Sequence, residues 1–149
     1  MEYLRQLSAN QVLWTAIISW FTAQVLKVIL VLITSKKLDF SRFVGSGGMP
    51  SSHSSFVVSL AVSVGITQGF DSAVFAVCSC LALVVMYDAA GVRRSAGQQA
   101  KILNRIAAEW EKGDFSNTEK KLKELLGHTP IEVVAGAILG IIIAVLRHL

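Results

Sequence analysis

Two histidines, His53 and His128, stand in stretches whose residue types suit the chemistry of a phosphate group. The first lies in GGMPSSHSS, residues 47–55, where Ser51 and Ser52 come directly before an apolar run. A helix that begins there presents unpaired backbone N–H groups and hydroxyl donors, and the preceding glycines allow a ligand to approach closely. We therefore expect an anion site at this helix start, most naturally one for phosphate.

A bound phosphate also needs positive charge and groups that move protons. The candidate positive side chains are Lys27, Arg42, Arg93 and Arg94. They could supply the countercharge through charge-assisted hydrogen bonds. Two histidines beside one phosphate fit phosphoryl transfer, in which one imidazole attacks phosphorus and the other protonates the departing oxygen.

Three of the polar residues also have plain structural interpretations. Glu132 follows Thr129 by three residues, so it fits a capping box and could fold back on its own helix start. Asp88 could pair with one of the two arginines that follow it or could bind a metal, and we favour the ion pair. Lys27 lies inside a long apolar run, where a lysine either faces the protein interior or snorkels to the surface.

The composition is that of a membrane protein. Of the 149 residues, 53% are hydrophobic and only 16% are charged, and the mean hydropathy is +0.58, whereas soluble domains carry about a quarter charged residues. This length suits one domain over residues 1–149. The net charge of +4 follows the loops between apolar runs, so we expect no nucleic-acid partner. The first apolar segment lacks a signal-peptide cleavage site and is expected to stay in the mature protein.

The elements that must position these residues are apolar helices. The apolar runs are residues 11–34, 54–68, 72–87 and 130–146. The second run spans a bilayer comfortably only if its helix begins near Ser51, and the tight turn at 68–71 makes the second and third runs antiparallel neighbours. A re-entrant hairpin is the alternative for that pair. The sequence thus predicts an all-α membrane bundle with about four spans.

The polar part of the chain is residues 91–127. Apolar side chains recur there every three or four residues between Ala96 and Trp110, which predicts an amphipathic helix lying on an apolar surface. Ser116 with Glu119 fits a capping box that opens a second short helix, for which Gly127 is a natural stop.

Loop charges indicate the orientation. With four crossings, the loops 35–53 and 88–129 share one side of the membrane and hold most lysines and arginines, whereas the other side has only Arg5 and Arg147. By the positive-inside rule, the side that is rich in lysine and arginine is cytoplasmic, and both termini lie on the opposite side of the membrane. The same topology gathers six polar residues at the cytoplasmic face: His53, Asp88, Arg93, Arg94, His128 and Glu132.

Three blocks of the sequence resemble the divergent branch of the type 2 phosphatidic acid phosphatase superfamily, relatives of lipid phosphate phosphatases and vanadium haloperoxidases. They are GGMPSSHSS (47–55), YDAAGVRRSAGQQAKILN (87–104) and LGHTPIEVVAGAILG (126–140), and the likeness covers the chain from about residue 24 onward. The resemblance implies that His53 is the general acid and that His128 is the nucleophile with Glu132 as its orienting carboxylate. Such an i, i+4 pair touches across one helical turn, and a carboxylate on Nδ1 leaves Nε2 available for attack.

The match departs from the superfamily pattern in its basic residues. The superfamily has an arginine shortly before the nucleophile, where this chain has Leu125, Leu126 and Gly127, so Arg93 or Arg94 must substitute from another loop. The superfamily's lysine-containing first block is also absent in its usual form. Lys27 and Arg42 are its candidate replacements. In the histidine blocks, Ser52 stands for a glycine and Glu132 for an aspartate.

These observations predict a membrane lipid phosphatase that hydrolyses a phosphate monoester through a phosphohistidine. Phosphatidylglycerophosphate, phosphatidate and an isoprenyl phosphate all fit as substrates. The alternative is a non-catalytic protein that binds or transports a lipid phosphate. No cofactor is expected, although a divalent metal such as Mg²⁺ stays open. The small-residue face of Gly136 and Gly140 is a possible homo-oligomer contact.

Overall fold

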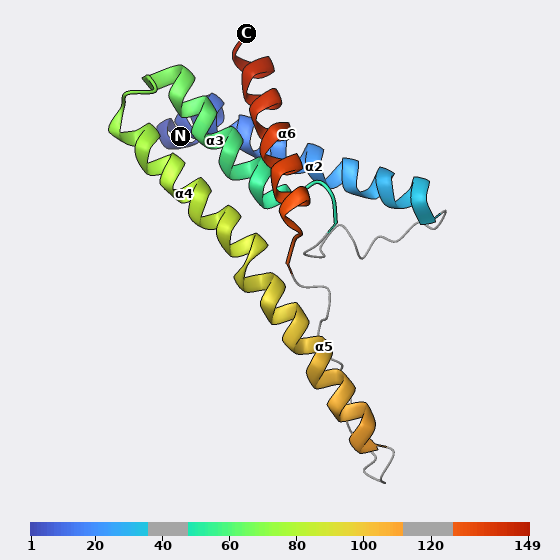
Figure 1. Cartoon of the computed structure of the whole chain (residues 1–149). Coiled ribbons are helices and arrows are strands. Elements are labelled where there is room, and N and C mark those ends of the chain that lie inside the picture. The colour runs from blue at the N-terminus through green and yellow to red at the C-terminus, as the bar shows by residue number, and fades with distance from the viewer. Residues whose placement is uncertain (36–47, 112–126) are drawn as a thin grey trace.

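The computed structural model describes residues 1–35, 48–111 and 127–149, and over these residues the chain is all-helical. Side chains are described for residues 1–33, 48–107 and 127–149. The helices are α1 (Glu2–Ala9), α2 (Gln11–Ser35), α3 (Ser52–Gln68), α4 (Ala73–Ala90), α5 (Val92–Glu111) and α6 (Pro130–His148) (Figure 1). The predicted class is therefore confirmed. Arg42 and the expected short helix after Ser116 lie outside the described residues.

Helix α3 is the centre of the bundle, because α2, α4 and α6 all pack against it. Its buried positions are mostly small, with serines recurring along the helix. Small side chains let neighbouring helix backbones approach closely, and hydroxyl groups can hydrogen-bond across the contact. Ser55 illustrates this, since its Oγ lies 2.6 Å from the Oγ of Ser19 on α2.

The glycines of α6 face α3 within the same chain. A Cβ at Gly136 would overlap the carbonyl oxygen of Ser51, and one at Gly140 would come within 2.7 Å of the Ser55 carbonyl oxygen and 3.0 Å of the Ser59 nitrogen. Both glycines are buried. The surface that the sequence suggested for a homo-oligomer is thus occupied by the intramolecular α3–α6 contact, because small residues serve close packing equally well inside one chain.

Within the part of the chain that the structure describes, three helical stretches are long and apolar enough to cross a membrane, namely Gln11–Ile33, Ala73–Ala107 and Pro130–His148. Helix α3, with 17 residues, is the central helix between them and brings the span count to about four. The predicted turn is present: Ser72 caps α4 by accepting a hydrogen bond from the Phe75 amide, and Gly69 has φ +95°. The sequence pattern therefore located helices α2, α3, α4 and α6 to within a few residues, whereas the stretch Ala73–Ala107 extends beyond the predicted run 72–87 because it takes in most of α5.

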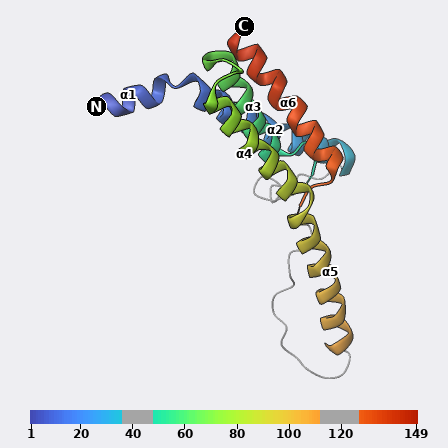
Figure 2. The same ribbon diagram turned by 60° about the vertical axis from the view of Figure 1, so that its left-hand side comes forward.

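Helix α5 continues the direction of α4 and projects away from the bundle (Figures 1 and 2). The amphipathic helix was correctly predicted, and Ala100 of its apolar stripe is buried. Leu103 and Ile106 are each about half exposed. The periodicity predicted the helix and its apolar face, whereas the nearly straight α4–α5 connection at Gly91 determines the direction in which the helix projects.

Candidate active site

Two backbone hydrogen bonds bring three chain segments together. The amide of Ser51 donates to the carbonyl of Glu132 over 2.9 Å, and the amide of His128 donates to the carbonyl of Ala89, also over 2.9 Å. The start of α3, the start of α6 and the end of α4 therefore meet at one place. The histidines separated by 75 positions in sequence belong to this junction.

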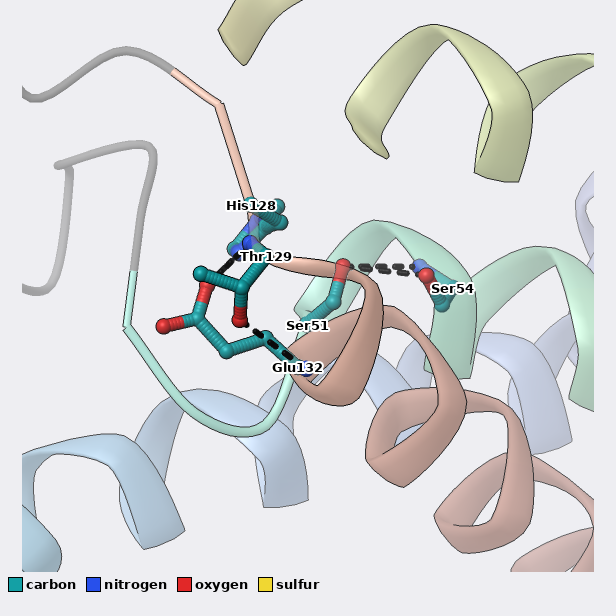
Figure 3. Close-up of polar contacts among 5 residues, drawn as sticks. All are labelled: Ser51, Ser54, His128, Thr129 and Glu132. Carbon is teal, nitrogen blue, oxygen red and sulfur yellow. Dashed lines mark hydrogen bonds and ion pairs between the residues drawn. The ribbon is translucent and has the colours of Figure 1, made fainter. Parts of the chain in front are cut away.

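The start of α3 is capped by serine, as the sequence predicted. Ser51 is the N-cap, and its Oγ accepts hydrogen bonds from the Ser54 amide and the Ser54 hydroxyl at 3.3 and 3.0 Å (Figure 3). Both Ser51 and Ser52 are buried. The Ser51 oxygen is thus engaged in holding the helix start, while His53 follows as a half-buried residue in the first turn.

Glu132 performs both roles that the sequence had left as alternatives. One of its carboxylate oxygens, Oε2, lies 3.1 Å from Nδ1 of His128 and also accepts a hydrogen bond from the Thr129 amide at 3.0 Å (Figure 3). The Thr129 hydroxyl in turn accepts from the Glu132 amide, which completes the capping box. The same contacts that begin α6 therefore orient the His128 ring.

The other ring nitrogen of His128 is unengaged. Its side chain is only 2% exposed, and within the part of the chain that the structure describes Nε2 is buried without a hydrogen-bond partner. Because a carboxylate accepts from Nδ1–H, the neutral ring has its lone pair on Nε2. Leaving a buried acceptor unpaired costs about 1–3 kcal/mol. An unpaired lone pair on an oriented imidazole is what a nucleophile requires.

The two imidazoles lie close together. The ring centroids of His53 and His128 are 6.2 Å apart with an interplanar angle of 61°. The first ring comes from α3 and the second from the segment leading into α6, so this proximity depends on the α3–α6 packing described above. Groups at this spacing can contact a single phosphate from adjacent sides.

Lys27 reaches this junction from within α2. Its side chain is 1% exposed, so it is buried and does not snorkel to the surface. A Cβ at Gly48, which has φ +90°, would lie 3.5 Å from both Cγ and Cδ of Lys27, so Gly48 lies directly against the lysine stem. The Lys27 charge acts on both imidazoles. Position 27 thus belongs to the same cluster as the histidines.

The two arginines after α4 have different surroundings. Arg93 Nε lies 2.6 Å from Asp88 Oδ2, with the two side chains 46% and 38% exposed, and the Arg93 charge acts on both imidazoles. Arg94 is exposed as well, but its backbone faces Gly127, where a Cβ would overlap it. Asp88 is therefore an ion-pair partner, and Arg93 is the arginine that faces the site.

The electrostatic balance keeps His128 neutral at physiological pH. Burial lowers the pKa of His128, the hydrogen bond and charge of Glu132 oppose that effect, and the positive charges of Lys27 and Arg93 lower the pKa further. The net result is a pKa below the ordinary histidine value. Neutral imidazole is the nucleophilic form, so the environment favours the reactive state.

An apolar cavity of about 380 Å³ adjoins His53. It is lined by Trp20, His53, Phe56, Val57, Val85 and Arg93. Its apolar walls have no distinct signal in the sequence, because these residues resemble ordinary membrane-helix residues until the helices are packed. Among the described residues, no group of three or more histidine, cysteine or acidic side chains is arranged to hold a metal ion.

Comparisons with known proteins agree with the blocks quoted above. A family model described as the divergent PAP2 family, where PAP2 denotes type 2 phosphatidic acid phosphatase, matches residues 8–143. The chain is 43% identical over 148 residues to "Uncharacterized membrane protein YuiD" of Bacillus subtilis (strain 168), covering 93% of this chain and 94% of that protein. No solved structure matches. The chain therefore belongs to the divergent PAP2 family of membrane proteins.

Proposed function

We propose that this protein hydrolyses the phosphate monoester of a membrane lipid, with His128 as nucleophile and His53 as general acid. One observation carries the proposal: His128 is oriented through Nδ1 by Glu132, has an unpaired Nε2, and lies with its ring centroid 6.2 Å from that of His53. Two imidazoles in such proximity, one of them held by a carboxylate, suit nucleophilic and acid–base catalysis. Membership of the divergent PAP2 family supports the same reaction class.

The reaction has two steps. In the first, the Nε2 lone pair of His128 forms a bond to phosphorus, the ester P–O bond breaks, and protonated His53 gives its proton to the departing lipid oxygen. In the second, neutral His53 takes a proton from water, the resulting hydroxide attacks phosphorus, and the P–N bond breaks to release inorganic phosphate. Glu132 stabilises the cationic ring that forms on His128, and Lys27 and Arg93 balance the phosphate charge.

The substrate class follows from the membrane location of the site. A lipid presents its phosphate at the helix ends while its hydrocarbon stays in the bilayer, so phosphatidylglycerophosphate, phosphatidate and isoprenyl phosphate all remain within the proposal. The lysine and arginine distribution supports a cytoplasmic site with both termini on the opposite side. In this arrangement the products separate, with phosphate entering the cytosol and the alcohol remaining in the membrane.

A second candidate function is binding of a lipid phosphate without hydrolysis. The burial of His128 favours it, because a substrate reaches Nε2 only if covering groups move aside. The half-buried His53 and the partly exposed Arg93 are accessible without such a movement. An anion held by these two side chains alone would be bound and not cleaved.

Phosphate release from purified protein separates the two functions. We would offer phosphatidate, phosphatidylglycerophosphate and an isoprenyl phosphate in nanodiscs, with and without vanadate, to wild type and to His128→Ala and His53→Ala. The proposal expects both variants to lose activity by a factor on the order of 10² or more. His148→Ala, near the C-terminal end of α6 and away from the α6 start, is the matched control and should keep wild-type activity.

A covalent phosphoramidate adduct, which is stable to base and labile to acid, provides the second readout. With a ³²P-labelled substrate, base-stable and acid-labile label should appear on wild type and be absent from His128→Ala, as expected for a phosphoramidate. Lipid binding that is unaffected by His128→Ala, together with no release from any of the three lipids, would instead establish the binder and exclude the phosphatase.

A further inference from the structure

We propose that the apolar cavity between α2, α3 and α4 receives one hydrocarbon chain of a phosphate-bearing lipid, with the phosphate at the His53–Arg93 end. The inference rests on the proposed function only for the hydrolysis of the phosphate once the lipid is bound. It assigns a chain-binding role to four residues that the reaction itself does not use, Trp20, Phe56, Val57 and Val85.

The cavity has the polarity of an amphiphile with an anionic head. Its walls are apolar side chains from α2, α3 and α4, namely Trp20, Phe56, Val57 and Val85, and its two polar lining residues are His53 and Arg93. His53 belongs to the first turn of α3 and Arg93 to the first turn of α5, so the polar groups gather where those helices begin. The guanidinium of Arg93, which also pairs with Asp88, and the imidazole of His53 therefore complement a phosphate attached to a hydrocarbon chain.

The size of the cavity favours one chain. About 380 Å³ lies near the lower end of the range of small-molecule pockets, which is roughly 300–1,000 Å³. Trp20 is 40% exposed, so the cavity wall reaches the lateral surface of the bundle, where bilayer lipid lies. A second chain of a two-chain lipid would stay in the bilayer beside α2. The whole hydrocarbon part of a single-chain lipid phosphate should therefore be able to bind in the cavity.

The cavity acts mainly by positioning. A hydrocarbon chain in a bilayer is already in an apolar medium, so moving it between helices gains little hydrophobic free energy. Its walls instead fix where the chain leaves the headgroup, which sets the phosphate beside His53 and Arg93. Filling the cavity should consequently lower the rate on chain-bearing substrates more than on substrates that have no chain.

The test uses neighbouring valines on α4. Val85→Phe extends a side chain into the cavity, whereas Val84→Phe makes the same change at a position that is 66% exposed and outside the lining. We would measure hydrolysis of a long-chain monoalkyl phosphate and of water-soluble p-nitrophenyl phosphate by each full-length protein in nanodiscs. Val85→Phe should lower the long-chain to soluble rate ratio at least about tenfold, and Val84→Phe should leave it unchanged. Equal ratios in the two variants would overturn the inference.

A binding measurement keeps the inference testable without turnover. Trp14→Phe and Trp110→Phe leave Trp20 as the only tryptophan, and a monoalkyl phosphate brominated along its chain quenches indole fluorescence on contact. Quenching should exceed that by brominated phosphatidylcholine at equal density, and Val85→Phe should reduce the excess while Val84→Phe should not. This result without phosphate release would retain the chain site and reject the phosphatase. No excess in the Trp20-only protein would reject the chain site even if hydrolysis occurs.

Discussion

Glu132 holds Nδ1 of His128 at 3.1 Å with the same carboxylate oxygen that closes the cap of α6. The orientation of the ring is therefore coupled to the formation of the helix. A substitution at position 132 can act through the helix start or through the ring charge, and these two effects are separable because glutamine also fits a capping box.

Glu132→Gln should reduce turnover with little loss of stability. The amide can still accept from the Thr129 N–H and from the ring, but it lacks the negative charge that stabilises cationic His128 in the reaction. We expect kcat to fall by a factor on the order of 10² or more, with a nearly unchanged melting temperature. Glu132→Ala should lower both quantities. A rate loss in the glutamine variant that merely follows its melting temperature would rule out the charge effect.

Arg93→Gln and Arg94→Gln should have unequal effects although the residues are adjacent. Both arginines are exposed, but Arg93 is held by Asp88, lines the cavity beside His53 and acts electrostatically on both imidazoles. Loss of a charge-assisted hydrogen bond costs about 1.5–3 kcal/mol, so vanadate inhibition should weaken about tenfold or more in Arg93→Gln. Arg94→Gln should stay within about twofold of wild type. Equal weakening would show that vanadate binding does not distinguish the two arginines.

Stability should rise with pH in the range just below the ordinary histidine pKa. The pKa of His128 is lower in the folded protein than in the unfolded chain. Between these two pKa values the unfolded chain binds more protons than the folded protein does. The free energy of unfolding is therefore highest above the ordinary histidine pKa and falls as the pH drops below that value. Melting temperatures measured between about pH 5 and pH 8 should show this slope. His128→Gln should reduce the slope, and an unchanged slope would assign it to other groups.

Gly136→Val should destabilise the bundle and disturb the site together. The added side chain would overlap the Ser51 carbonyl at the helix start that carries His53. Overpacking of this kind costs about 1–3 kcal/mol. Ile138→Val on an exposed part of the same helix should change stability by no more than about 0.5 kcal/mol. Unfolding in detergent followed by circular dichroism would show whether only the glycine position is sensitive.

The sequence by itself determined the helices and the residue types of the site. Long apolar runs located α2, α4 and α6 because a membrane helix needs about 20 apolar residues whatever its neighbours are. Local chemistry was equally direct: Ser51 and Thr129 are caps, and Glu132 contacts His128, because residues three or four positions apart on a helix are neighbours.

Only the tertiary structure decided which distant residues meet. Helix packing decides that Arg93 and not Arg94 acts on the histidines. It also buries Lys27 beneath Gly48 and places Gly136 against α3. The apolar cavity beside His53 is of the same kind. Such contacts join residues whose separation along the chain carries no periodic signal, so they follow from close approach of helix backbones and cannot be read from spacing alone.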